Sequence, residues 1–358
     1  MEFDRRSFLG MGLAALVATS QPATAATLSV PAIDSLDLTV VVDNFSNVFA
    51  PDFERADITV TGPVPAPDYH KAYAGEWGYS LLARSAVGGS TPHTTLIDFG
   101  YTPKALLNNL DLLGVSPGSI DAMVLSHGHY DHFGGLDGLL ATREVRRRTP
   151  LFVGGEEAFC ERLRGTRPGA SSFGAIDRPA IARAGIDLIV SGDPHVVAGH
   201  RFTTGEIPYV TSERPRVPTA MLPGRQCDRA LLEPAKRDLN FVVDDAIHEL
   251  GTAFNLSGHG LVVIGACSHR GIINTIRRAQ AVSGVSRVHA IVGGFHLVPP
   301  QTKAQALETV AMMQALNPDY IIPGHCSGDV FLNAASAAMP DKVVRSVVGA
   351  RYRFGRRA

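Results

Sequence analysis

The sequence predicts a single mixed domain of the α/β (α+β) class. With 358 residues, of which 45% are hydrophobic and 19% charged, the chain can bury a large core. An apolar strand followed by a polar turn and a helix occurs at residues 120–143 and again at residues 260–280, a pattern typical of sheets covered by helices. No Ser/Gly linker, charge run or short repeat marks a boundary, so we expect one continuous domain over residues 27–358.

The N-terminal segment, residues 1–25, is predicted to be a signal peptide. Arg5 and Arg6 precede a short apolar run, and Ala23-Thr24-Ala25 fits a small-residue cleavage site. These features resemble a twin-arginine export signal, with a general secretory signal as the alternative. The apolar run is shorter than the roughly 20 residues of a membrane span. We therefore expect the twin-arginine translocation machinery to deliver the protein to the periplasm or extracellular space, without a stable membrane anchor.

Charge and cysteine content limit the classes of binding partner and the roles of the cysteines. The formal net charge is −1 and the sequence pI is about 6.9, so no electrostatic footprint favours nucleic acid, and we expect a small-molecule substrate. Four cysteines are too few for a disulfide scaffold, and their pairing cannot be derived from the sequence. Cys267 and Cys326 each lie beside a histidine of interest and could equally be buried, inert thiols.

The expected elements follow one another as strands and helices along the mature chain. Alternating or continuous apolar runs predict strands, and leucines at helical spacing predict helices. The first sheet is expected from strands at 36–44, 79–86, 94–100 and 120–125, with helices at 103–113 and 132–143. The later half is expected to contain a strand and an amphipathic helix within 260–280, and further strands within 289–297 and 319–328.

The segment VLSHGHYDHFGGL, residues 124–136, predicts a metal site. It places His127, His129, Asp131 and His132 directly after an apolar strand. A Gly-containing turn lets these side chains point at one centre instead of alternating across a sheet. Imidazole and carboxylate groups are ligands of Zn²⁺ and similar cations, and four such groups so close together are hard to bury without a cation.

Three later strands also end in a histidine. His269, His296 and His325 each follow an apolar strand, and Asp98 closes an earlier strand. A single histidine of this kind is more often structural. Their repetition predicts that the strand ends converge on one site.

The segments carrying these residues resemble one known family. The motif after the strand matches the H-x-H-x-D-H signature of the metallo-β-lactamase superfamily. The segments VDN, EWGYS, LIDFG, TTGEIP, VDDAI, ACSHRGIIN, GGFHL and PGHCSG are similar, in order, to the branch named for dihydropterin ribofuranosyl-aminobenzene phosphate synthase. The resemblance implies a four-layer αββα sandwich with metals at one edge.

The resemblance also implies a set of site residues. TTGEIP, at residues 203–208, lacks the histidine that many related hydrolases carry there, so His269 is expected to replace it. Two divalent metal ions are expected, Zn²⁺ first and Mn²⁺ or Fe²⁺ as alternatives. His127, His129 and His269 would hold one, and Asp131, His132 and His325 the other. His296 is expected to face the substrate as an acid or hydrogen-bond donor, with a ligand role as the alternative. Asp98 and Cys267 are expected to support the ligands from behind, with a bridging thiolate as the alternative for Cys267. Asn44, Glu76 and Arg270 are expected to bind the substrate.

Three functions compete at this point. Two cations lower the pKa of bound water enough to supply hydroxide near neutral pH, with Asp131 holding its proton, which suits hydrolysis of an ester, lactone, phosphoester or similar bond. The branch name implies a transferase instead, and a non-catalytic metal- or ligand-binding protein is the third alternative. Expected export favours the exported metallohydrolase, because phosphorylated pterin intermediates are cytosolic.

Overall fold

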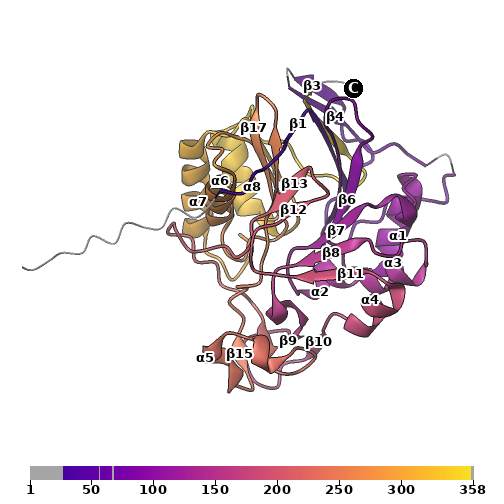
Figure 1. Ribbon diagram of the computed structural model, residues 1–358. Coiled ribbons are helices and arrows are strands. Elements are labelled where there is room, and N and C mark those ends of the chain that lie inside the picture. The colour runs from indigo at the N-terminus through magenta and orange to yellow at the C-terminus, as the bar shows by residue number, and fades with distance from the viewer. Residues whose placement is uncertain (1–26, 56, 67, 356–358) are drawn as a thin grey trace, which may run out of the picture.

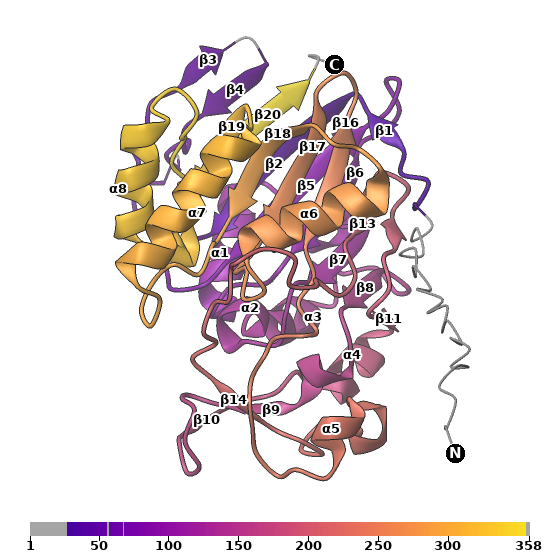
Figure 2. The same ribbon diagram turned by 90° about the vertical axis from the view of Figure 1, so that its left-hand side faces the viewer.

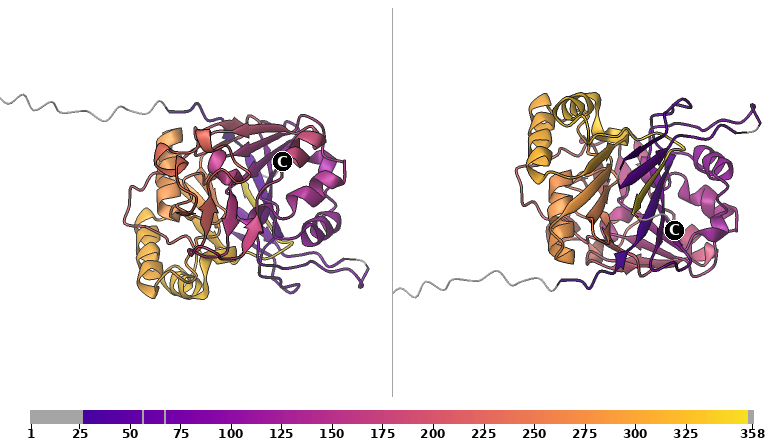
Figure 3. Two further views of the ribbon diagram at one scale, coloured as in Figure 1. Left: turned by 90° about the horizontal axis from the view of Figure 1, so that it is seen from below. Right: turned by 90° about the horizontal axis from the view of Figure 1, so that it is seen from above.

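The computed structural model describes residues 27–55, 57–66 and 68–355, so the predicted signal peptide at 1–25 lies outside the described residues. Two large β-sheets face each other and helices cover their outer faces, as Figures 1 and 3 show. The expected αββα sandwich and mixed α/β class are therefore confirmed. Among helices of the described residues, none combines the length and apolar character needed to cross a bilayer.

The larger sheet has nine strands within the described part of the chain. From one edge to the other they are β11 (Asp187–Val190), β8 (Pro150–Val153), β7 (Ala122–Leu125), β6 (His93–Ile97), β5 (Ser80–Ala86), β2 (Ser35–Val42), β20 (Arg351–Gly355), β4 (Ile58–Thr61) and β3 (Phe53–Arg55). β6, β7, β8 and β11 are parallel neighbours, whereas the remaining pairs are antiparallel.

The facing sheet has seven strands, counted over the same described ranges. They are β12 (Val196–Val197), β13 (Arg201–Thr203), β16 (Thr252–Leu256), β17 (Gly260–Gly265), β18 (Val288–Gly293) and β19 (Tyr320–Pro323), with β1 (Ala32–Ile33) beside β16. β17, β18 and β19 are parallel and end in register, because Gly265 pairs with Gly293 and Gly293 with Pro323.

A small antiparallel sheet lies beyond one end of the sandwich, at the bottom of Figure 2. Its strands are β10 (Ser172–Gly174), β9 (Glu161–Leu163), β14 (Ala220–Leu222) and β15 (Val242–Val243). The short helix α5 (Pro234–Arg237) accompanies it.

Helices cover both outer faces (Figure 1). On the nine-stranded sheet these are α1 (Pro103–Leu112), α3 (Leu136–Ala141) and α4 (Arg178–Ala184); on the seven-stranded sheet they are α6 (Ile272–Ser283), α7 (Lys303–Leu316) and α8 (Asp329–Ala338). The one-turn helix α2 (Tyr130–Phe133) follows β7, and 3₁₀ turns lie at Pro117–Ser119, Glu156–Phe159, Arg229–Leu231 and His325–Ser327.

Alternation along the central strands builds three apolar layers. In β17, Val262 and Ile264 face the layer between the sheets, whereas Leu261 and Val263 face the layer under α6 and α7. Strands buried on both faces alternate in this way because successive side chains point to opposite sides. The central strands are therefore buried on both faces, between the facing sheet and the outer helices.

One expected helix is interrupted. Instead of the single helix expected over residues 132–143, the structure has two, because α2 ends at Phe133 and α3 begins at Leu136. A Cβ on Gly134 would lie 2.1 Å from the Tyr101 carbonyl oxygen, and one on Gly135 2.1 Å from that of Phe99. The two glycines therefore let the chain pass close to the loop after β6, which breaks the helix.

Candidate metal centre

The ends of parallel strands from both sheets supply the candidate ligands. β7 ends at Leu125, and one residue separates this end from His127. In the facing sheet, His269 follows β17, His296 follows β18 and His325 follows β19. The carboxyl ends of parallel neighbours share one edge of a sheet, so a ligand placed after each strand reaches the same crevice. The expected convergence is thus a consequence of the topology.

Three imidazoles form the first group. His127, His129 and His269 each offer one ligating atom, and these atoms all lie within 4.8 Å of one another. The ring of His269 lies 4.8 Å from that of His127 and 4.5 Å from that of His129, centroid to centroid. His269, which is expected to replace the histidine missing from residues 203–208, therefore lies beside His127 and His129.

The second group contains Asp131, His132 and His325. The Nε2 atoms of His132 and His325 are 3.2 Å apart, and Asp131 Oδ2 lies 3.9 Å and 3.5 Å from them. His132 donates from Nδ1 to Asp98, so its Nε2 presents a lone pair toward His325. Nitrogen atoms facing each other so closely need a cation or a proton between them.

Unpaired buried nitrogen atoms show that a metal fits the site. His127 Nε2, both ring nitrogens of His269, His296 Nε2 and His325 Nδ1 are buried without a hydrogen-bond partner. Burial, and then the neighbouring imidazoles, hold the pKa of His127 and that of His269 well below the ordinary value. Neutral imidazoles are the form that coordinates a metal.

Asp98 supports the ligands from behind, in the position expected for it. The carboxylate accepts from His132 Nδ1 at 2.6 Å and from the backbone N–H of Ser126 at 2.7 Å. The Ser126 hydroxyl donates to the same carboxylate and accepts from His127 Nδ1 at 2.9 Å. These bonds set the tautomers of both histidines and leave each Nε2 free for the centre.

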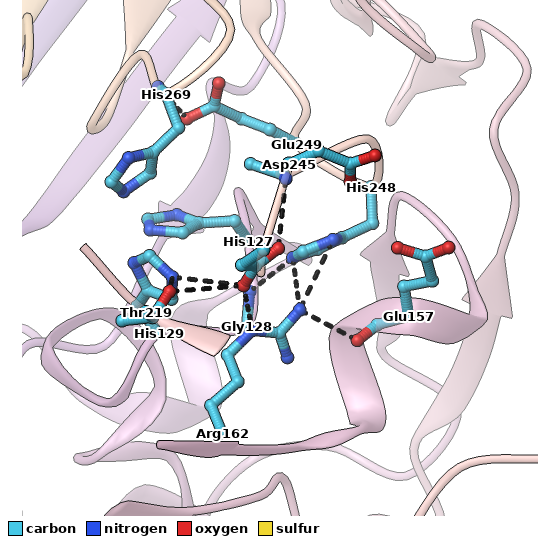
Figure 4. A network of polar contacts seen from close by, with 12 residues as sticks. His127, Gly128, His129, Glu157, Arg162, Thr219, Asp245, His248, Glu249 and His269 are labelled. Carbon is cyan, nitrogen blue, oxygen red and sulfur yellow. Dashed lines mark hydrogen bonds and ion pairs between the residues drawn. The ribbon is translucent and has the colours of Figure 1, made fainter. Parts of the chain in front are cut away.

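A buried ionic network supports His129. Its Nε2 lies 2.9 Å from the Thr219 hydroxyl and 3.4 Å from Asp244, which pairs with Arg162 at 2.6 Å. Figure 4 shows His129, Thr219 and Arg162 within this network. Burial alone would raise the pKa of Asp244, but the Arg162 guanidinium and His129 hold it well below the usual range. His248 joins the network by accepting from the Gly128 N–H at 3.1 Å. Because Nε2 of His129 is used here, Nδ1 is the atom left for a metal.

Two further carboxylates fix the later ligand loops. Glu249 accepts from the backbone N–H groups of His269 and Arg270 at 2.8 and 2.6 Å, and Asp43 accepts from that of His325 at 2.8 Å. Sequence reasoning assigned no role to Glu249, Asp43 or Asp244. The only signal was that VDN and VDDAI, which contain Asp43 and Asp244, belonged to the matching segments.

Two thiols and His296 complete the floor of the site. Cys267 and Cys326 are buried free cysteines with their sulfur atoms 3.2 Å apart, and Cys267 Sγ lies 3.6 Å from His296 Nδ1. Cys267, His269 and His296 also form a group with metal-ligand spacing. The structure thus places Cys267 and His296 close enough to the metal positions for either a supporting or a ligating role.

The backbone is left-handed at several of these strand ends. The φ angles are 57° at Asp98, 62° at Ser268, 45° at His296 and 47° at His325. Non-glycine residues rarely adopt this region, and it costs free energy that the surrounding structure must supply. The strain redirects the side chain after each strand into the crevice.

A cavity of about 320 Å³ opens above the candidate ligands. Its volume suits a small molecule. Aromatic rings and one cation line the outer part, whereas histidines, Asp131 and the thiols line the floor. The lining residues are Trp77, Tyr101, His129, Tyr130, Asp131, Arg164, Phe173, Pro218, Thr219, Cys267, His269, His296, Val298, Pro299, His325 and Cys326.

The three residues expected to bind substrate have structural contacts instead. Glu76 accepts from the N–H groups of Tyr101 and Thr102 and from the Thr102 hydroxyl, so it holds the start of α1. Asn44 donates to the His325 carbonyl at 2.9 Å. Arg270 is buried against the ring of Tyr209 and donates to backbone carbonyls. None of the three lines the cavity above the histidines, and the cation there is Arg164.

The sandwich and its strand-end histidines define the metallo-β-lactamase fold. Residues 87–212 match the model of the metallo-beta-lactamase superfamily. The crystal structure of a metal-dependent hydrolase of the beta-lactamase superfamily has a TM-score of 0.64, covering 88% of this chain and 98% of that one at 20% identity. The shared architecture is therefore that of this fold.

Two curated relatives are similar to this chain in sequence. The chain is 28% identical over 266 residues to 7,8-dihydropterin-6-methyl-4-(beta-D-ribofuranosyl)-aminobenzene-5'-phosphate synthase of Methanocaldococcus jannaschii, covering 73% of this chain and 84% of the relative. It is 37% identical over 101 residues to ribonuclease Z of Aeropyrum pernix, covering 28% of this chain and 29% of that protein.

Proposed function

We propose that the protein is an exported binuclear metallohydrolase acting on a small molecule. The observation that carries this proposal is the convergence of the five candidate histidine ligands and Asp131 beneath one cavity, whose lining includes His129, His269, His325 and Asp131, with several ring nitrogens left unpaired. The complete set of expected ligands argues against a binding protein that has lost catalysis on this scaffold.

The proposed residues divide the chemistry among them. His127, His129 and His269 would hold one divalent cation, and Asp131, His132 and His325 the other, with Zn²⁺ as the expected ion. Bound cations would supply a water nucleophile near neutral pH and polarise the oxygen under attack. Asp131, 19% exposed toward the cavity, would hold the proton of the attacking water, and His296 would donate a proton to the leaving group.

The cavity wall narrows the substrate class. Trp77, Tyr101, Tyr130 and Phe173 offer ring faces for a planar or apolar group. Arg164 donates to the Tyr101 hydroxyl at 2.8 Å and is the cation of the cavity lining. We infer a substrate that combines an apolar or aromatic part with an anionic group, cleaved at an ester, lactone or phosphoester bond.

A transferase is the second candidate. It is supported by the likeness to the archaeal synthase, which spans most of that relative, and an aromatic cavity with a cation also suits the product in that relative's name. The expected export argues against a transferase of this kind, because phosphorylated pterin intermediates are cytosolic.

Export is supported by the only disulfide within the described residues. Cys160 and Cys227 are bonded to each other and largely buried. Stable structural disulfides are typical of oxidising compartments and rare in the cytosol. This agrees with the twin-arginine signal proposed for residues 1–25.

One experiment tests the proposed function. The mature protein is purified from metal-supplemented medium, its metal content is measured, and it is assayed on anionic aromatic esters, lactones, phosphodiesters and β-lactams before and after chelation. We expect at least two ions per chain and a chelator-sensitive hydrolysis whose KM rises in Arg164→Ala. A metal-free protein, or a loaded protein that transfers groups from the synthase's substrates but hydrolyses none of the panel, would overturn the hydrolase assignment.

A further inference from the structure

A second group of ligand-type side chains lies at the opposite end of the sandwich. His259 precedes β17 and His289 is the second residue of β18, whereas Cys267 and His296 follow the other ends of these strands. Asp57 comes from the turn between β3 and β4, in the facing sheet. The parallel strands therefore separate this group from the candidate metal centre.

The spacing of this group is that of metal ligands. One ligating atom from each of Asp57, His259 and His289 lies within 4.8 Å of the other two. Asp57 Oδ2 faces two imidazole nitrogens, His259 Nδ1 at 3.7 Å and His289 Nδ1 at 3.8 Å. These distances are too long for hydrogen bonds. They are close to the roughly 3.3 to 3.6 Å that separates ligands bound tetrahedrally at 2.0 to 2.2 Å.

Surrounding contacts hold the group in place. Tyr320 donates its hydroxyl to Asp57 Oδ1, which leaves Oδ2 toward the histidines. The rings of His259 and His289 lie 4.8 Å apart. His289 is fully buried, and its Nδ1 faces both Asp57 and Asp319. A coordinated cation would offset the cost of holding these imidazole and carboxylate groups away from water.

Asp319 provides a fourth oxygen. Its Oδ2 lies 2.8 Å from His289 Nδ1 and 2.9 Å from the Arg287 guanidinium. A cation bound at His289 Nδ1 would replace this hydrogen bond, and the same oxygen could then complete a four-coordinate site.

We propose that Asp57, His259 and His289, with Asp319 as fourth ligand, form a structural site for one Zn²⁺ ion. Two imidazoles and two carboxylates are donors that this cation accepts, and four protein ligands close a structural site to substrate. Asp57 belongs to the nine-stranded sheet, and the other three come from turns and strands of the seven-stranded sheet. The ion would tie the two sheets together at the end away from the catalytic cavity.

Co²⁺ and Zn²⁺ are the probes for the test. A His127→Ala/His132→Ala chain, which loses one ligand from each of the two candidate catalytic positions, is titrated with Co²⁺ and its absorption recorded. We expect tetrahedral Co²⁺ bands that the further change His259→Ala removes, with a loss of one bound ion per chain. Zn²⁺ should raise the unfolding temperature of the first chain and leave that of the His259→Ala chain unchanged.

Two controls keep the test decisive. His70→Ala, in the same background, removes an exposed histidine that also faces a carboxylate, Asp68 at 3.0 Å, and should change neither reading. Asp57→Asn serves as a second variant if His259→Ala fails to fold. Equal ion content and equal Zn²⁺-induced shifts with and without His259 would overturn the site, whatever the outcome for the catalytic centre.

Discussion

At the scale of single residues, His269 is the proposed ligand on which the first proposed metal position most depends. A zinc site with His127 and His129 alone would have two protein ligands, whereas catalytic sites ordinarily keep three. His269→Ala should therefore lower metal affinity by at least about 10- to 100-fold, the loss that even supporting residues cause. The measurement is competition of the purified variant with a chelator of known affinity. His93→Ala, which changes a half-exposed histidine far from the centre, is the control. Unchanged affinity in His269→Ala would refute the assignment.

His296 lies where it could act either as a proton donor to the leaving group or as a metal ligand. Its ring lies 4.1 Å from that of His269, yet its proposed task is proton donation to the leaving group. His296→Ala should keep the full metal content and lower kcat by about 10²- to 10⁴-fold, the range typical of acid catalysis. Metal analysis and steady-state kinetics on one preparation distinguish the outcomes. Loss of an ion from this variant would make His296 a ligand.

Sequence reasoning found residues that follow strands and missed those that support them from a distance. The spacing within 124–136 and the repetition of strand-end histidines indicated the ligands, because parallel strands end at a common edge. Asp43 and Asp244 act through contacts with His325 and Arg162, whose sequence separations are large, and no spacing encodes such contacts. Arg270 is expected at the substrate because a cation at this position could hold a phosphate or carboxylate, but its guanidinium packs on the ring of Tyr209 and donates to backbone carbonyls.

At the scale of elements, Glu213 makes the anchoring of α6 depend on pH. Its carboxylate accepts from the backbone N–H groups of Ile273 and Asn274 and from Thr309. Burial raises the pKa of Glu213 from 4.5 to about 7, against the lowering by these hydrogen bonds. A carboxyl whose pKa is raised on folding contributes stability below its unfolded pKa, and this is lost as pH rises through the folded value.

The wild-type chain should therefore lose stability relative to Glu213→Gln between about pH 4.5 and pH 7, by up to roughly 3 kcal/mol at about 1.4 kcal/mol per pKa unit. Urea unfolding of both chains at pH 5 and pH 8 measures the difference. A wild-type chain that gains stability over the variant as pH rises would contradict the raised pKa.

The small sheet depends on a covalent link. The Cys160–Cys227 disulfide joins the start of β9 to the loop after β14 and spans a sequence separation of 67 residues. Closing a loop of that length stabilises the fold by about 4 kcal/mol in the chain-entropy model. Cys160→Ala/Cys227→Ala should lower the free energy of unfolding by about that amount, as measured by urea titration. Cys326→Ala, which removes no disulfide, is the comparison, and a change below about 1 kcal/mol in the double variant would refute the estimate.

At the scale of the whole molecule, the sandwich could be predicted, whereas the small sheet could not. Apolar runs and the resemblance together indicated two facing sheets, because every central strand carries a strong apolar pattern. The strands of the small sheet have two or three residues each, too short for any periodicity. Phe173 of β10, Arg164 directly after β9 and Thr219 directly before β14 line the cavity, so this part of the cavity wall could not be predicted from the sequence.

The disulfide also provides a test of the proposed export. Twin-arginine export carries folded proteins, and the Cys160–Cys227 bond is expected to persist only in an oxidising environment. Replacing Arg5 and Arg6 with lysine should therefore leave a precursor in the cytoplasm whose Cys160 and Cys227 are both alkylated after denaturation. Wild-type protein from the periplasm should leave this pair unalkylated and expose only Cys267 and Cys326, a difference of two labels by mass spectrometry. A lysine variant that reaches the periplasm at the normal rate, with the pair oxidised, would assign export to the general secretory route.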